Sequence, residues 1–147
     1  IIPGHILERF AGRAVNLHIS YLPWNRGADP NLWSFVESTP KGVTIHYLDE
    51  GIDTGDIIAQ ERVEFDSSEE TLRSSYQKLQ KAIQALFRRH WPAIKAGTCP
   101  RRPQTGPGTT HRTRDRQEIE HLLTAGWDTP VSKLRGRTPP APSGSDR

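Results

Sequence analysis

Two short apolar stretches constrain this chain more than any other feature, because each carries polar residues that strand packing does not require. They span residues 14–19 and 43–48, are rich in β-branched residues and are bounded by Gly or Pro, which is typical of buried strands. Side chains alternate along a strand, so Asn16 and His18 share one face of the first stretch, and Thr44 and His46 share one face of the second. The sequence therefore predicts that an amide and an imidazole point to the same side.

An acidic, glycine-containing loop follows the second stretch. It covers residues 49–55 and can fold a carboxylate back over the strand ends. A lone His on a strand is more often structural than catalytic, but an Asn on the same face changes that balance. The amide of Asn16 can donate to an oxyanion, His18 can accept a proton near neutral pH, and a carboxylate can orient the imidazole. This set of groups suits acyl transfer without a protein nucleophile.

The same residues form a pattern in two blocks. The first block contains Asn16, His18, Ser20, Leu22, Pro23, Arg26 and Gly27, and the second contains Gly42 to His46, Asp53, Gly55, Ile57, Ile58 and Gln60. The pattern resembles the 10-formyltetrahydrofolate-dependent formyltransferases. That family includes phosphoribosylglycinamide formyltransferase, methionyl-tRNA formyltransferase and the nucleotide-sugar N-formyltransferases. The resemblance covers residues 1–96.

The resemblance implies an α/β, Rossmann-like domain that uses 10-formyltetrahydrofolate as formyl donor and no metal. It implies that Asn16, His18 and Asp53 are the catalytic residues. The residues that it implies for substrate or donor binding are His46, Arg26, Asp49, Gly51, Ser20 and Trp24. We expect the loop after Asp49 to help hold the pterin ring.

The acceptor amine is less closely defined by the resemblance. The stretch from His18 to Phe35 is most similar to enzymes that act on nucleotide-linked amino sugars, such as dTDP-4-amino-4,6-dideoxyhexoses. Glycinamide ribonucleotide is the second candidate. The chain after residue 97 is too short for the RNA-binding barrel of methionyl-tRNA formyltransferase, which argues against a nucleic-acid substrate. A truncated, non-catalytic remnant that only binds a ligand or partner stays open, as does a homodimer.

Composition favours one small domain. The chain has 147 residues, of which 33% are hydrophobic, enough for a modest core and a polar extension. A single cysteine, Cys99, excludes an intramolecular disulfide and fits a reducing cytoplasm, and no run is apolar enough to span a membrane. The basic excess lies after residue 97, with 9 Lys or Arg against 5 Asp or Glu. This small excess favours a solvated extension over a nucleic-acid site.

Periodicity and breakers predict the remaining elements. We expect a helix from Pro3 to Phe10, a helix from Pro30 to Val36, a strand within residues 56–65 and a short helix over residues 114–123. A long amphipathic helix is expected from Ser67, in a capping box with Glu70, to about Trp91 before Pro92. Its predicted apolar stripe contains Leu72, Tyr76, Leu79, Ile83 and Leu86.

We divide the chain into residues 1–97, the back part of a catalytic domain, residues 98–134, a breaker-rich linker with a short helical extension, and residues 135–147, a disordered tail. The chain opens on Ile1-Ile2-Pro3 without Met, and the strands and helices of the family's front half are not in it. We expect a parallel sheet with an open edge beside the Asn16 strand. The 147-residue chain alone is therefore expected to be poorly stable and inactive.

Overall fold

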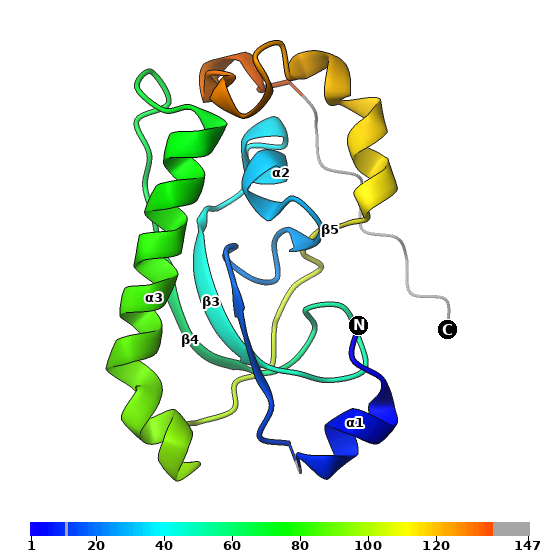
Figure 1. Cartoon of the computed structure of the whole chain (residues 1–147), viewed down its shortest axis with the longest axis vertical. Coiled ribbons are helices and arrows are strands. Elements are labelled where there is room, and N and C mark those ends of the chain that lie inside the picture. The colour runs from blue at the N-terminus through cyan, green and yellow to red at the C-terminus, as the bar shows by residue number, and fades with distance from the viewer. Residues whose placement is uncertain (11, 137–147) are drawn as a thin grey trace.

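The computed structural model describes residues 1–10 and 12–136 as a mixed α/β fold (Figure 1). Within these residues the elements in chain order are α1 (Gly4–Arg9), β1 (Val15–His18), β2 (Arg26–Gly27), α2 (Pro30–Val36), β3 (Gly42–Tyr47), β4 (Ile57–Arg62), α3 (Leu72–Ala96) and β5 (Thr110–His111). Short 3₁₀ helices follow at Thr113–Glu118, Glu120–Leu122, Gly126–Asp128 and Val131–Lys133. The expected helices near Pro3 and Pro30 and the expected strands are therefore confirmed.

The main sheet has the order β1-β3-β4, and both of its pairings are antiparallel. The prediction of a parallel sheet is wrong for these strands. Residues 48–56 alone join β3 to β4, and this connection is too short for the crossover that parallel neighbours need. Among the described strands β1 lies at one edge of the sheet, as expected.

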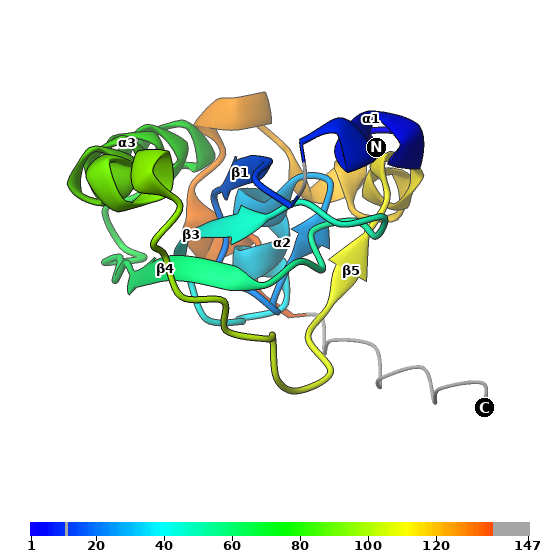
Figure 2. The same ribbon diagram turned by 90° about the horizontal axis from the view of Figure 1, so that it is seen from below.

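The register confirms which polar residues share a face. Asn16 lies opposite His46, and His18 lies opposite Thr44. Directly paired residues project to the same side of a sheet, so these four side chains gather on one face. On the other face, α3 packs against the sheet through a buried apolar cluster that includes Ile45. Figure 2 shows α3 to one side of the three strands and β5 to the other.

The long helix begins and ends later than predicted. Its cap is Thr71, whose side chain accepts a hydrogen bond from the Ser74 amide at 3.1 Å, and not Ser67. The reason is a local turn, because Asp66 accepts hydrogen bonds from the backbone and hydroxyl of Ser68 and so competes with helix formation. The helix continues through Pro92 and ends at Gly97, which has a left-handed φ of 70°.

One member of the predicted apolar stripe is not part of the core. The side chain of Tyr76 is 49% exposed, and the neighbouring Ser75 is buried instead. Ser75 can occupy this position because its hydroxyl donates to the Leu72 carbonyl at 3.0 Å within the same turn. Tyr76 is thereby left to line a surface pocket.

The segment after residue 97 packs closely on the preceding residues, unlike a free linker. The backbones of Ile57 and Arg102 exchange two hydrogen bonds, of 2.8 and 3.1 Å. Further on, Ile119, Val131 and Leu134 are buried in one cluster with α2. The helix expected over residues 114–123 is present as 3₁₀ turns. A domain boundary at residue 97 stays a prediction, and the predicted tail lies, from residue 137 onward, outside the described residues.

Within residues 1–10 and 12–136, no helix combines the length and the apolar character needed to cross a lipid bilayer.

Candidate active site

Asp53 is the point at which the predicted catalytic residues meet. Its Oδ1 lies 3.4 Å from Asn16 Nδ2 and 3.4 Å from His46 Nε2, and its Oδ2 lies 3.7 Å from His18 Nδ1. The acidic loop thus folds back over the polar face of β1 and β3, as the sequence predicts. The structure brings the proposed trio of Asn16, His18 and Asp53 together, and it adds His46 to the same group.

Gly27 anchors the carboxylate from the other side. Its backbone N–H donates to Asp53 Oδ2 at 2.8 Å. Gly27 has a φ of +86°, and a Cβ at this position would lie 2.1 Å from the carbonyl oxygen of His111 in the neighbouring β5. Only glycine allows this close approach of β2 to β5. The glycine of the Arg-Gly pair in the sequence pattern therefore holds Asp53 directly.

The environment keeps Asp53 ionised. Burial alone would raise the pKa of its carboxyl group, but the hydrogen bond with His46, the nearby charge of His18 and the Gly27 amide lower it to about 2. A carboxylate that stays charged at neutral pH can stabilise a positive charge on an adjacent imidazole.

His18 is held in one tautomer. Its Nε2 lies 2.9 Å from the carbonyl oxygen of Asn25, and a carbonyl can only accept, so Nε2 carries the hydrogen. Burial lowers the pKa of His18, and the attraction of Asp53 and the Asn25 carbonyl oppose this only in part. The neutral ring therefore presents a free lone pair at Nδ1, beside the Asp53 carboxylate, where a proton can be accepted.

His46 and Asn16 complete the group. His46 is buried, and its Nδ1 lies 2.9 Å from the Tyr47 carbonyl oxygen, so Nδ1 carries a hydrogen. Its Nε2 lies 3.4 Å from Asn16 Nδ2 and 3.4 Å from Asp53 Oδ1. The amide of Asn16 donates one hydrogen to Asp53 Oδ1 at 3.4 Å. Both contacts are long, and this NH₂ group can turn to a developing oxyanion.

Asn25 was not identified from the sequence. It is fully buried, with a φ of 56°. Its side chain donates to Thr39 Oγ1 at 2.7 Å and its backbone N–H donates to Thr109 Oγ1 at 2.8 Å. These bonds fix the carbonyl that selects the His18 tautomer. The available signal was an Asn in a tight loop, because Asn tolerates positive φ better than most residues.

Gln104 was also missed, because it lies in the segment that the sequence predicts to be a linker. Its Nε2 donates to the carbonyl oxygens of Asp53 and Gly55 at 2.8 and 2.9 Å. Its Oε1 accepts from Arg26 Nη2 at 2.7 Å and Nε at 3.1 Å. Gln104 therefore ties the end of the acidic loop to β2 through Arg26.

The other predicted binding residues differ in their roles. Asp49 Oδ1 accepts from the Gly51 amide at 2.9 Å and from Thr54 Oγ1 at 2.6 Å, so Asp49 and Gly51 shape the acidic loop. Ser20 is buried and its carbonyl accepts from Thr44 Oγ1 at 2.7 Å. Among the described residues, the structure does not bring Ser20 or the half-buried Trp24 into the hydrogen-bonded group around Asp53.

The fold and this group of side chains correspond to a known family. The family model described as formyl transferase matches residues 1–90. The chain belongs to the formyl transferase family.

Individual relatives narrow the comparison. The chain is 54% identical to the formyltransferase PseJ from Anoxybacillus kamchatkensis, whose crystal structure is a complex with UDP-4,6-dideoxy-4-formamido-L-AltNAc and tetrahydrofolate. That match covers 91% of this chain and 70% of PseJ, with a TM-score of 0.88.

Two curated relatives match at lower identity. The dTDP-4-amino-4,6-dideoxyglucose formyltransferase of Mycobacterium bovis is 29% identical over 83% of this chain and 54% of its own length. The methionyl-tRNA formyltransferase of Syntrophus aciditrophicus is 33% identical over 93% of this chain and 43% of its own length. The chain thus spans about half the length of the curated relatives that it matches.

Proposed function

We propose that the protein transfers a formyl group from 10-formyltetrahydrofolate to the amino group of a nucleotide-linked amino sugar. The observation that carries this proposal is the grouping of an amide, a neutral imidazole and an ionised carboxylate, formed by Asn16, His18 and Asp53, with Asp53 oxygens 3.4 Å from Asn16 Nδ2 and 3.7 Å from His18 Nδ1. The similarity to PseJ supports the choice of acceptor class. The described residues then form the catalytic part of a Rossmann-like domain.

The chemistry follows from the positions of these atoms. Asn16 Nδ2 donates to the formyl oxygen as negative charge develops on it, and His18 Nδ1 accepts the proton that the attacking amine loses. Asp53 stabilises the imidazolium, while the Asn25 carbonyl keeps its hydrogen bond to Nε2. The new bond joins the amine nitrogen to the formyl carbon, the bond from that carbon to the donor nitrogen breaks, and His18 returns its proton to the leaving nitrogen.

The acidic loop fits the expected donor. Helix α1 lies against it, since a Cβ on Gly4 would lie 3.1 Å from Glu50 Oε1. Ile2, which lies just before α1, is 42% exposed, and Ile52, which lies in the acidic loop, is 39% exposed. Both side chains offer apolar surface to a ligand. Flat apolar ligands bind such surfaces with a few polar groups for orientation. In this proposal residues 49–55 hold the pterin ring, and the donor supplies the formyl group.

The acceptor class is tested by ligand-dependent stability together with turnover. Ligands that bind only the native state raise the melting temperature. We expect amino-sugar nucleotides to do so, and glycinamide ribonucleotide and methionyl-tRNA to have little effect. Release of tetrahydrofolate in the presence of 10-formyltetrahydrofolate and an amino-sugar nucleotide measures the transfer. Selective stabilisation by methionyl-tRNA would overturn the proposal. Ligand binding without formyl transfer, in a protein with all of its active-site residues present, would favour a binding protein.

A further inference from the structure

Residues 109–111, which include β5, lie against the loop that carries Asn25. The hydroxyl oxygen of Thr109 accepts a hydrogen bond from the Asn25 N–H at 2.8 Å, and the Thr109 N–H donates to the Pro23 carbonyl at 3.2 Å. The Asn25 carbonyl is the acceptor that selects the tautomer of His18. The position of Thr109 therefore affects the orientation of the His18 ring.

The same segment also affects the position of Asp53. The His111 carbonyl accepts from the Ala28 N–H at 2.9 Å, and His111 lies opposite Gly27 in the pairing of β2 with β5. The Gly27 N–H in turn binds the Asp53 carboxylate. β5 has only two residues, and the backbone hydrogen bonds of so short a pairing are marginal by themselves. A side-chain contact that holds β5 in this register therefore matters to the site.

The side chain of His111 makes such a contact. Its Nε2 lies 2.9 Å from Oε1 of Glu37, and both side chains are buried. The imidazole ring also stacks on the buried ring of Trp33, with the ring centroids 4.0 Å apart and an interplanar angle of 4°. The hydrogen bond fixes the direction of the His111 ring, and the stacking fixes its plane.

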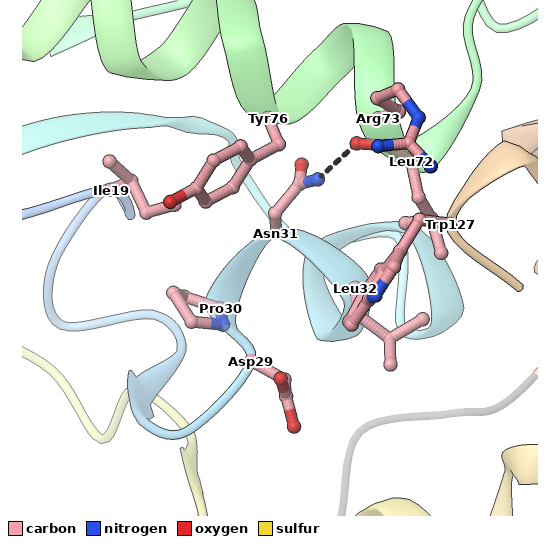
Figure 3. A pocket seen from close by; sticks show the side chains of 9 residues that line it. All are labelled: Ile19, Asp29, Pro30, Asn31, Leu32, Leu72, Arg73, Tyr76 and Trp127. Carbon is pink, nitrogen blue, oxygen red and sulfur yellow. Dashed lines mark hydrogen bonds between the residues drawn. The ribbon is translucent and has the colours of Figure 1, made fainter.

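Both partners of His111 belong to a helix that is itself held in place. Trp33 lies in α2, and Glu37 caps the end of this helix. Near the start of α2, Asn31 Nδ2 donates to the Leu72 carbonyl at 3.1 Å, drawn as a dashed line in Figure 3, and to Ser75 Oγ at 3.0 Å. These bonds tie α2 to α3. Because two residues separate β2 from α2, the contact with His111 ties β5 to the same frame that carries β2.

We propose that His111 is a positioning residue for the formyl transfer, and this inference rests on the proposed function. Its contacts with Glu37 and Trp33 hold β5 in the register that supports the catalytic groups. His111 acts through the backbones of β5 and β2 and not on the reacting atoms. Loss of its contacts should therefore lower kcat and leave the KM values of both substrates little changed.

A double variant, His111→Leu with Glu37→Leu, tests this role without leaving one buried polar group unpaired. Apolar replacement of both members of a buried ion pair is often neutral for stability, so we expect this variant to fold. Its kcat should fall roughly 10- to 100-fold, the scale for a small displacement of catalytic groups. His111→Gln keeps an N–H donor near the position of the ring Nε2 and should retain most of kcat.

Leu134→Ala is the matched control for stability. Leu134 is buried in the same apolar cluster as Trp33, so its truncation weakens that cluster while the pair of Glu37 and His111 stays present. This variant should have a lower melting temperature and an unchanged kcat at temperatures where it is folded. A loss of kcat in the double variant beyond that of Leu134→Ala therefore reports positioning.

NMR of the His18 imidazole gives a readout that does not depend on turnover. The hydrogen on its Nε2 is bonded to the Asn25 carbonyl in a buried site, so it should exchange slowly with solvent in the unmodified protein. Exchange should be faster in the double variant and stay slow in His111→Gln and Leu134→Ala.

A double variant with unchanged kcat, or with unchanged exchange of the His18 hydrogen, would overturn the inference and leave the proposed function standing. Absence of formyl transfer in the unmodified protein would instead remove the proposed function. In that case the exchange rate alone decides the inference, because faster exchange in the double variant would still show that His111 positions His18.

Discussion

Asn16 Nδ2 lies between Asp53 Oδ1 and His46 Nε2, at 3.4 Å from each. These distances exceed the usual range for a strong hydrogen bond. Little free energy is therefore lost when the amide turns to a substrate oxygen. At the scale of single residues, the Asn16 amide is therefore held only weakly by the groups around it.

Asn16→Ala should lower kcat roughly 10²- to 10³-fold, the scale for the loss of one oxyanion donor, with little change in melting temperature. Steady-state release of tetrahydrofolate measures this effect. Leu17→Ala is the control, because Leu17 is the next residue on β1, points to the opposite face and is 38% exposed. Near-normal turnover in Asn16→Ala would exclude the assigned role.

The pH dependence of kcat/KM should report His18. Burial lowers its pKa from the ordinary value of 6.5. The neutral, proton-accepting form therefore persists below that pH, and activity should fall only on further acidification, through the lowered pKa. The contribution of neutral His18 to stability has the same sign, since it is present above pH 6.5 and lost as the pH falls.

Asp53→Asn provides the internal check on this assignment. The Asp53 charge raises the pKa of His18 against the effect of burial, so its removal should move the acid limb to still lower pH while reducing kcat. Proton uptake at His18 can be followed by NMR of the imidazole resonances over the same range. An acid limb at or above pH 6.5 in the unmodified protein would contradict the lowered pKa.

At the scale of elements, Gln104 joins the acidic loop to β2, although it belongs to neither. Gln104 donates to Asp53 and Gly55 and accepts from Arg26, which is 78 positions away in the sequence. β2 and the acidic loop after β3 are thereby held in one arrangement. Gln104 is a positioning residue, since it reaches the reacting groups only through the backbone of Asp53.

Gln104→Ala should reduce kcat/KM roughly ten- to a hundred-fold, because small displacements of catalytic groups are costly. This reduction should arise mainly from a higher KM for the formyl donor, because the acidic loop is the expected donor site. Gln117→Ala, on an exposed position of the first 3₁₀ helix, is the control. Equal losses of activity in the two variants would argue for a structural role alone. A Gln104→Ala variant with a lower melting temperature and unchanged kinetics would argue for the same.

At the scale of the whole molecule, residues 98–136 contribute to the core that supports the site. Ile119, Val131 and Leu134 pack with α2, the helix that follows the Gly27 anchor of Asp53. The opposite side of the sheet is covered by α3. The polar face of β1 and β3 is thus supported by two clusters, and one of them depends on the last described part of the chain.

Leu134→Ala should lower the free energy of unfolding by about 2–5 kcal/mol, the range for removing a fully buried Leu side chain. Leu17→Ala, at an exposed position, should cost less than about 0.5 kcal/mol. Urea denaturation with constant m-values measures both changes. Equal, small effects of the two substitutions would show that the segment around Leu134 is not part of the cooperative unit.

The sequence alone predicted which polar groups gather at the candidate site. Strand alternation placed Asn16 and His18 on one face of β1, and Thr44 and His46 on one face of β3, because that pattern depends only on neighbouring residues. The acidic loop after the second strand predicted a carboxylate over the strand ends, and the resemblance to formyltransferases implied that this carboxylate is Asp53. Only the tertiary structure decided that the strands pair antiparallel, that Asn25 selects the His18 tautomer and that Gln104 joins the acidic loop to β2. These features depend on contacts between residues far apart in the chain, which leave no local periodic pattern.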